Sequence, residues 1–414
     1  MHEKIISYAS IVFFVCIALE FLVARKRQRH LYRLNDAINS LSLGVMSQIC
    51  GVFLKAFSIG IYAWIYQHTA FFQLNPSNPL VWLSGLLLYD FLYYWLHRFG
   101  HETAILWAAH VVHHQSESYN LSTALRQTSS GALLGWLFYV PMAIIGWPPE
   151  VFLVIALIDL LYQFWVHTEQ IGKLGWFDRV FVSPSNHRVH HAVNDIYLDK
   201  NYGGILIIWD RLFGTYSDEL EQHPVVYGTR SPLRSWNPLW ANLEVYLVLA
   251  KDTWRTRRWV DKFKVWLKPP GWRPADLPPY SKNFDLARPI YNPPLSKAMQ
   301  VYCLLQFAAL LQIGTDFLLN FPQMSAINAA ILAFWQIFSL WCLGGLMERA
   351  RIYVWPELLR LLMLLAMIVF SQSWFYHYAL SSAAIALLSA ACVCSILALT
   401  FIVYYAPHGS AASA

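Results

Sequence analysis

Long blocks of apolar residues, separated by short polar linkers, dominate the pattern of this chain. Each block approaches the ~20 residues that an α-helix needs to cross the hydrocarbon layer of a bilayer. The pattern therefore predicts membrane-spanning helices at 5–24, 41–66, 79–96, 130–147, 149–167, 298–319, 325–344, 352–372 and 379–405.

Two details refine this prediction. The stretch Gly146-Trp147-Pro148-Pro149 separates the fourth block from the fifth, which predicts a tight turn within a helical hairpin. Lys55 interrupts the second block, so a shallower helical hairpin is the alternative to a single span there.

Composition supports a membrane protein. Of the 414 residues, 57% are hydrophobic and 13% are charged, whereas soluble domains average about 45–50% and about 25%. We therefore expect an all-α fold, a multi-pass integral membrane bundle of helices. The predicted regions are N-terminal membrane spans at 1–78, a histidine-motif core at 79–220, a membrane-surface connector at 221–297 and C-terminal transmembrane helices, with almost no polar content, at 298–414.

The distribution of basic residues predicts the topology. Lys and Arg are concentrated in the segments 25–33, 168–297 and 345–351. None occurs in the linkers 67–78, 146–149, 320–324 and 373–378. Counting spans in order places all basic segments on one side, which the positive-inside rule makes cytoplasmic, in a bacterial inner membrane or the endoplasmic reticulum. Because topology accounts for the net charge of +6, we expect no nucleic-acid partner.

Residues 240–268 predict a surface helix. Trp259, Phe263 and Trp266 recur at helical spacing among Lys and Arg residues. Such a helix can lie in the headgroup layer with its aromatic face towards the lipid, or it can pack on the rest of the protein. The Pro-rich stretch 268–296 that follows predicts a non-helical connector.

The six cysteines all lie inside apolar blocks, and no two have C-x-x-C or zinc-finger spacing. We therefore expect neither disulfides nor a zinc ribbon. Small buried hydrophobic side chains are the simpler interpretation.

Histidines carry the chemical signal of the sequence. Of 15 histidines, most lie within 97–191. They form one H-x-x-x-H motif, two H-x-x-H-H motifs and one isolated position: His97 and His101; His110, His113 and His114; His187, His190 and His191; and His167.

The spacing of these histidines predicts a site for two metal ions. Residues i and i+4 share a helix face, so His97 and His101 can point at one centre. Adjacent residues diverge by about 100° around a helix axis, so the last two histidines of each H-x-x-H-H motif can reach two neighbouring ions. The predicted topology brings all these histidines to the cytoplasmic face.

Orienting an imidazole ring requires a partner for its second nitrogen, and polar residues near the motifs are candidates for that role. Asp90 precedes His97 by two turns in an apolar span, where a carboxylate needs a partner. Asp159 holds a similar position before His167, and Asn186 is also a candidate helix cap. The full set of candidates is Asp90, Asp159, Glu102, Glu117, Glu169 and Asn186.

Imidazole ligands suit iron, zinc, copper and nickel, so ligand chemistry alone leaves the metal open. A closed structural zinc site is disfavoured, because the histidines outnumber the four ligands that it needs. A metal transporter is disfavoured as well. Transport predicts polar residues through the depth of the spans, whereas these histidines gather at one end.

The three histidine motifs resemble those of the fatty acid hydroxylase/sterol desaturase superfamily. The stretches 110–127, 161–169 and 183–216 further resemble the members of that superfamily that oxidise alkylglycerols. The resemblance covers roughly 80–220 and only the general layout elsewhere.

The resemblance implies two iron ions held by the eight clustered histidines and His167, with O₂ as co-substrate. It also implies a membrane lipid as substrate, oxidised beside an ether oxygen, and tetrahydrobiopterin as electron donor. A sterol or fatty-acyl hydroxylase or desaturase with the same centre, reduced by an electron donor protein, is the alternative.

Overall fold

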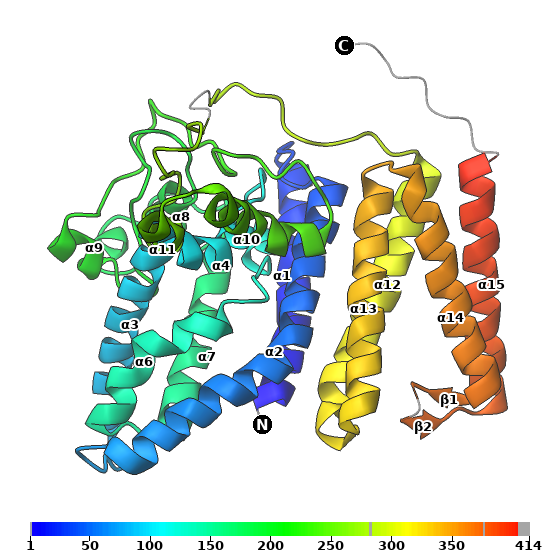
Figure 1. Cartoon of the computed structure of the whole chain (residues 1–414), viewed down its shortest axis with the longest axis horizontal. Helices are drawn as coiled ribbons and strands as arrows, with labels where there is room; N and C mark the ends of the chain where they lie inside the picture. The colour runs from blue at the N-terminus through cyan, green and yellow to red at the C-terminus, as the bar shows by residue number, and fades with distance from the viewer. Residues whose placement is uncertain (1, 281–283, 376, 405–414) are drawn as a thin grey trace.

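The computed structural model describes residues 2–280, 284–375 and 377–404 and is almost entirely helical (Figure 1). The helices are α1 (His2–Lys26), α2 (Leu34–Thr69), α3 (Pro79–Glu102), α4 (Ala104–His114), α5 (Leu121–Ala124), α6 (Ala132–Ile145), α7 (Pro149–Trp165), α8 (Pro184–His190), α9 (Ile208–Phe213), α10 (Pro238–Arg255), α11 (Trp259–Leu267), α12 (Lys297–Asn320), α13 (Ala326–Met347), α14 (Val354–Ser371) and α15 (Ser382–Tyr404). Short 3-10 turns lie at η1 (Phe177–Arg179), η2 (Phe321–Gln323) and η3 (Arg351–Tyr353). Two short strands, β1 (Ser373–Trp374) and β2 (Tyr378–Ala379), pair antiparallel between α14 and α15. The all-α prediction is confirmed, with this hairpin as a minor exception.

Every apolar block forms helix, but in the described residues only six helices are long and apolar enough to cross a membrane. These spans are Leu34–Leu54, Pro79–Glu102, Lys297–Gln323, Ala326–Met347, Arg351–Ser371 and Ser382–Tyr404. Neither α6 nor α7, which the sequence predicted to cross, is among these candidate spans. Their 14 and 17 residues extend only about 21 and 26 Å, against a hydrocarbon core of about 30 Å. The hairpin alternative for 41–66 is wrong, because α2 is one continuous helix.

The turn between α6 and α7 forms where it was predicted. Gly146 has a φ of +125°, and a Cβ there would lie 2.0 Å from the carbonyl oxygen of Phe72. This close approach accompanies main-chain hydrogen bonds from Phe71 to Ile144 and from Phe72 to Ile145. Glycine is required because a side chain would clash with the segment between α2 and α3.

Residues 240–268 form two helices, not the single helix expected. The chain turns at Thr256–Arg258, where the Asp276 carboxylate accepts from the Thr256 hydroxyl and the Arg257 main-chain N–H. In a continuous helix the Arg257 N–H would donate to the carbonyl group four residues earlier, and here the side chain of Asp276 accepts from it instead. The segment after α11 is non-helical in its described residues, as the prolines predict.

The C-terminal helices α12 to α15 stand beside the rest of the molecule and enclose an apolar core (Figure 1). Leu332, Leu340 and Ile368 are completely buried there. Glu357, Arg360 and Gln306 of this region form one buried network, whereas Gln336 and Ser339 are buried with main-chain partners. "Almost no polar content" is therefore an incomplete description, since a charged pair holds the centre of this bundle.

Candidate metal centre

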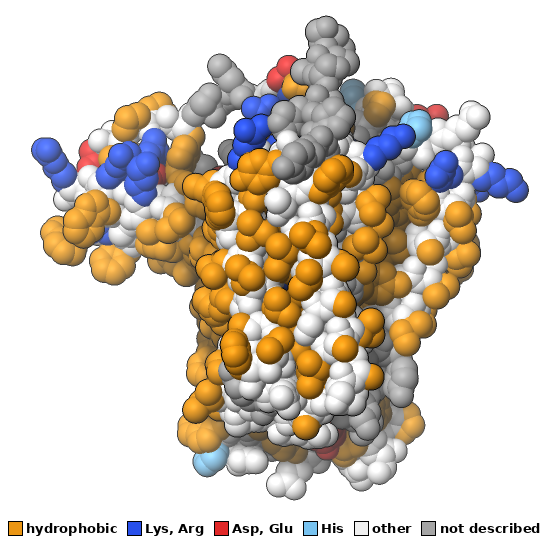
Figure 2. Space-filling model, turned by 90° about the vertical axis from the view of Figure 1, so that its right-hand side faces the viewer, with side chains coloured by type: hydrophobic (Ala, Val, Ile, Leu, Met, Phe, Trp, Pro, Cys, Tyr) orange, Lys and Arg blue, Asp and Glu red, His pale blue; other side chains and the backbone are white. Residues whose placement is uncertain are grey.

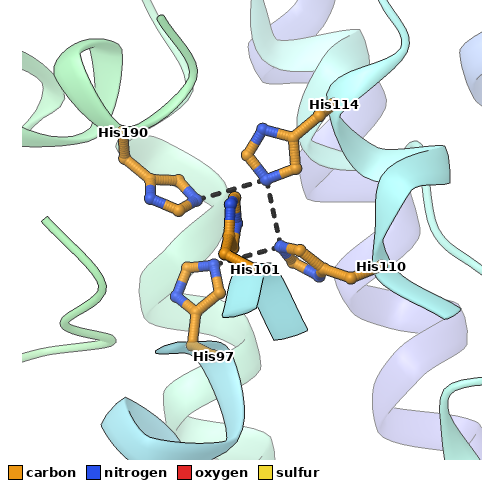
Figure 3. Close-up of side chains that lie close together, drawn as sticks. All are labelled: His97, His101, His110, His114 and His190. Carbon is orange, nitrogen blue, oxygen red and sulfur yellow. Dashed lines mark hydrogen bonds between the residues drawn. The ribbon is translucent and has the colours of Figure 1, made fainter. Parts of the chain in front are cut away.

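Nine histidines converge in two adjoining clusters. Within each cluster, the candidate ligand atoms all lie within 4.8 Å of one another. The first cluster, shown in Figure 3, contains His97, His101, His110, His114 and His190. The second cluster contains His113, His167, His187 and His191. The structure therefore brings together every histidine that the motifs single out.

Neighbouring histidines separate as helix geometry predicts. His113 and His114 end α4 and fall into different clusters. His190 ends α8 and enters the first cluster, whereas His191, the C-cap of α8, enters the second. The H-x-x-H-H motif thus connects the two clusters covalently, because its adjacent rings diverge around the helix axis.

The imidazole Nε2 atoms face one another at short range. In the first cluster, Nε2 of His110 lies 3.1 Å from that of His97 and 3.0 Å from that of His114, and His190 lies 3.2 Å from His114. In the second cluster, Nε2 of His167 lies 3.1 Å from those of His113 and His187. Nε2 of His191 lies 3.2 Å from that of His187.

Main-chain carbonyl groups fix the other nitrogen of four of these rings. Nδ1 of His97 lies 2.7 Å from the carbonyl oxygen of Tyr202, and Nδ1 of His190 lies 3.1 Å from that of Lys200. In the second cluster, the partners are Arg126 for His113, at 2.9 Å, and Gln163 for His167, at 2.7 Å. A carbonyl oxygen can only accept, so each of these Nδ1 atoms must carry the proton.

A ring protonated on Nδ1 and neutral overall presents a lone pair at Nε2. The Nε2 atoms of His113 and His167 therefore face each other as two acceptors, which repel unless a cation lies between them. A metal ion about 2.0–2.1 Å from each imidazole nitrogen would separate adjacent ligand nitrogens by roughly 3.0–3.4 Å. The observed separations fit that geometry.

Burial keeps the histidines neutral. Desolvation, followed by the neighbouring imidazoles, holds the pKa values of His110, His114 and His191 well below the usual range. For His113, burial lowers the pKa to about 4 despite the hydrogen bond to the Arg126 carbonyl. At neutral pH these rings are therefore unprotonated ligand donors.

Asp90 acts on the histidines through a loop. Its carboxylate accepts from the main-chain N–H groups of Ile205 and Leu206, at 2.7 and 3.1 Å, and from the Trp209 indole at 2.8 Å. The same loop contains Tyr202, whose carbonyl oxygen orients His97. Asp90 thus fixes the loop that orients His97.

Asp159 lies beside the same loop. A Cβ on Gly204 would lie 2.7 Å from Oδ1 of Asp159, and this oxygen is buried without a hydrogen-bond partner among the described residues. Its other oxygen accepts from Gln163 at 2.6 Å, and the carbonyl group of Gln163 orients His167.

The remaining candidates make their hydrogen bonds elsewhere. Glu102 pairs with Arg98 at 2.9 Å, and Glu117 accepts from the Tyr291 N–H at 2.8 Å. Asn186 is not the cap itself. Ser183 caps α8 and Asn186 completes the reciprocal capping box from the third helical position. Glu169 contributes its carbonyl oxygen to Arg29 at 3.1 Å.

Sequence reasoning missed two supporting residues. Asp210 accepts from the main-chain N–H groups of Tyr202 and Gly203 at 2.7 and 2.8 Å, which holds the carbonyl group that orients His97. An acidic residue inside the apolar stretch 204–213 was the available signal. The second is Arg126.

Arg126 is 1% exposed and supports α4 with both its side chain and its main chain. Its guanidinium donates to the Val112 carbonyl group at 2.6 Å and to Gln115 Oε1 at 3.2 Å, while its own carbonyl group orients His113. Nothing in the local sequence pattern distinguishes this arginine from the other cations.

Comparison with known proteins places these residues in context. A model of the fatty acid hydroxylase family matches residues 82–215, which include all nine clustered histidines. Alkylglycerol monooxygenase from Homo sapiens is 36% identical over 82% of this chain and 77% of its own length. The proteins of that name from Danio rerio and Xenopus tropicalis are 36% and 37% identical, over 87% and 74% of this chain and 82% and 69% of their own lengths. No solved structure gave a significant match.

Proposed function

Because the chain belongs to the fatty acid hydroxylase family, whose members include lipid-modifying membrane oxidoreductases, we propose that it is a di-iron monooxygenase that oxidises alkylglycerols. The substrate class rests on relatives named alkylglycerol monooxygenase, which match most of this chain. The resemblance seen in the histidine motifs points the same way.

The metal ligands in this proposal are the nine clustered histidines. The single observation that carries it is the set of Nε2 atoms 3.0–3.2 Å apart, with Nδ1 of four rings committed to carbonyl groups. The family supports iron as the metal. Five donors in one cluster and four in the other leave room at both ions for a further ligand.

When bound, the two iron ions supply O₂ activation, which no amino-acid side chain can perform. The protein keeps the imidazoles neutral and buries seven of the nine, and the carbonyl groups of Tyr202 and Arg126 fix the direction of His97 and His113. In the reaction, one oxygen atom of O₂ enters the C–H bond beside the ether oxygen. The other oxygen atom, with two electrons and two protons, becomes water.

Hydroxylation beside an ether oxygen gives a hemiacetal, which breaks down to an aldehyde and a glycerol product. We propose tetrahydrobiopterin as the source of the two electrons, on the strength of the family resemblance. An electron donor protein is the alternative reductant.

We place the site on the cytoplasmic side of the membrane, in a bacterial inner membrane or the endoplasmic reticulum. The basic segments 25–33 and 345–351 lie at the same end of the spans as the histidine clusters, which supports this orientation (Figure 1).

The proposal is tested with the purified protein in lipid nanodiscs. Ether lipid, sterol and acyl lipid are supplied in turn, with and without reduced pterin, and products are identified by mass spectrometry together with the iron content. Aldehyde release from ether lipid that requires reduced pterin is the expected result. Hydroxylated or desaturated sterol or acyl product alone would replace the substrate assignment with the alternative function.

A further inference from the structure

The two helices α10 and α11 lie across the axes of the spans, at the end of the molecule that holds the histidine clusters (Figure 1). They are joined by the short turn at Thr256–Arg258 and pack against each other. This unit, the α10–α11 hairpin, is the part of the connector with regular structure.

Each helix of the hairpin leaves an apolar face uncovered. On α10, Leu243, Leu247 and Trp254 are exposed at helical spacing, with Trp254 87% exposed. On α11, Trp259 and Phe263 are one turn apart and are 75% and 69% exposed. Leu267 continues the α11 face by another turn. Such a concentration of exposed aromatic and aliphatic side chains marks an interaction surface.

The hairpin is also strongly basic where it meets solvent. Its exposed cations are Lys251, Arg255, Arg257, Arg258 and Lys268. Its two buried carboxylates are already paired, Asp252 with Arg273 at 2.7 Å and Asp261 with Arg258 at 3.1 Å. The remaining positive charge therefore favours a negatively charged surface.

The basic and the apolar side chains lie on different sides of the part of the molecule that projects from the spans in Figure 2. Figure 2 shows Lys and Arg on the upper side of the part that projects to the left, and hydrophobic side chains on its lower side. This lower side faces the level at which the apolar surface of the spans begins. A helix with this division of side chains lies in the headgroup layer with its apolar face in the acyl boundary.

The opposite side of the hairpin supports the metal-binding region. Leu249 of α10 and Val265 of α11 pack against Ala104 and Ala108 of α4. The carbonyl group of Lys268, directly after α11, accepts from the Ala104 main-chain N–H at 2.9 Å. The hairpin therefore holds the helix that carries His110, His113 and His114.

We propose that the α10–α11 hairpin is a membrane-surface anchor whose partner is the anionic lipid leaflet on the histidine side of the protein. Its exposed apolar stripe enters the headgroup layer, and its cations contact lipid phosphates. Its inner face packs on α4 and positions this helix at the level of the leaflet. The anchor brings the histidine clusters to the depth at which a lipid headgroup is presented.

The direct test places an environment-sensitive fluorophore on the full-length protein, after the native cysteines are replaced, in nanodiscs holding one copy each. Phe263→Cys probes the stripe, and Gln222→Cys, at an exposed position of the connector outside the hairpin, is the control. With phosphatidylglycerol in the nanodisc, the label at position 263 is expected to shift to shorter wavelength and to be quenched by lipid nitroxides near the headgroup. The label at 222 should show neither effect. A label at 263 that stays in water, or that is shielded only by a second copy or an added protein, would overturn the proposal.

A functional test rests on the proposed oxygenase activity. The double variant Trp259→Gln/Phe263→Gln should reduce oxidation of bilayer-embedded lipid several-fold at unchanged iron content, while Gln222→Ala, outside the hairpin, should change it little. Unchanged oxidation by the double variant would contradict the role of the hairpin in positioning α4 at the membrane surface. Failure of every lipid substrate would contradict the proposed function and leave the fluorescence result to decide the anchor.

Discussion

The protein buries two polar clusters of opposite character, one in the histidine region and one in the C-terminal helices. In the C-terminal cluster, Glu357 accepts from the Tyr302 hydroxyl at 2.6 Å and from Arg360 at 2.8 Å. Arg360 also donates to Gln306 at 2.7 Å, and Gln306 donates to Ser395 at 2.9 Å. Each of these donors meets an acceptor.

In the histidine clusters, acceptors meet acceptors. Nε2 of His113 and Nε2 of His167 lie 3.1 Å apart while both Nδ1 atoms are committed to carbonyl oxygens. Burial alone therefore does not identify a functional site. A network that is complete without a ligand stabilises the fold, whereas one that lacks cations at its centre requires them from solution.

The largest effect is expected from breaking the histidine clusters. His114→Ala should lower lipid oxidation by more than about 100-fold, since even residues that only orient a ligand contribute roughly 10- to 100-fold. Iron content, measured by mass spectrometry, should fall with it. Wild-type iron content in this variant would remove His114 from the ligand set.

Lowering the pH should weaken the histidine clusters. Because the folded pKa of His113 is lowered to about 4, below the ordinary 6.5, the unfolded chain takes up protons first as pH falls. The histidines therefore contribute their full stability above pH 6.5 and lose it as the pH falls from 6.5 to about 4. Iron content and unfolding temperature should both decrease over this window. Full iron retention at its lower end would contradict the prediction.

The C-terminal network should respond to mutation through stability alone. Arg360→Met leaves the buried Glu357 without its cation, which should cost about 3–5 kcal/mol of stability. The double variant Glu357→Leu/Arg360→Met should recover most of that loss. Thermal unfolding in nanodiscs measures both, and iron bound per folded chain should stay unchanged. A loss of iron per folded chain would contradict this prediction and show that the C-terminal network affects metal binding.

The smallest of these effects is expected from the loop that orients His97. Asp210→Asn weakens the hold on the Tyr202 carbonyl group, and we expect a 10- to 100-fold loss of iron affinity or activity. Trp209→Phe, which removes one donor to Asp90, is the matched control with a smaller loss. Equal activity of Asp210→Asn and wild type would show that the loop holds without this carboxylate.

The same contrast explains what the sequence could predict. Helix periodicity was enough to expect that His113 and His114 would serve different centres, because that divergence is local. The roles of Asp210 and Arg126 depend on carbonyl groups placed by distant parts of the chain, which no local pattern records. The break between α10 and α11 was missed for the same reason, since Asp276 lies outside both helices. α6 is shorter than expected, in part because the apolar stretch continues into the turn at Trp147, whereas α7 begins at Pro149 as expected and ends at Trp165.

X-ray absorption at the iron edge of the purified protein tests the central claim most directly. Two iron ions per chain, with nitrogen or oxygen neighbours at about 2.0–2.2 Å and the outer-shell scattering of imidazole rings, are the predicted result. Substoichiometric metal in every preparation, or a sulfur neighbour at about 2.3 Å, would contradict the assignment of the two histidine clusters as a paired metal site.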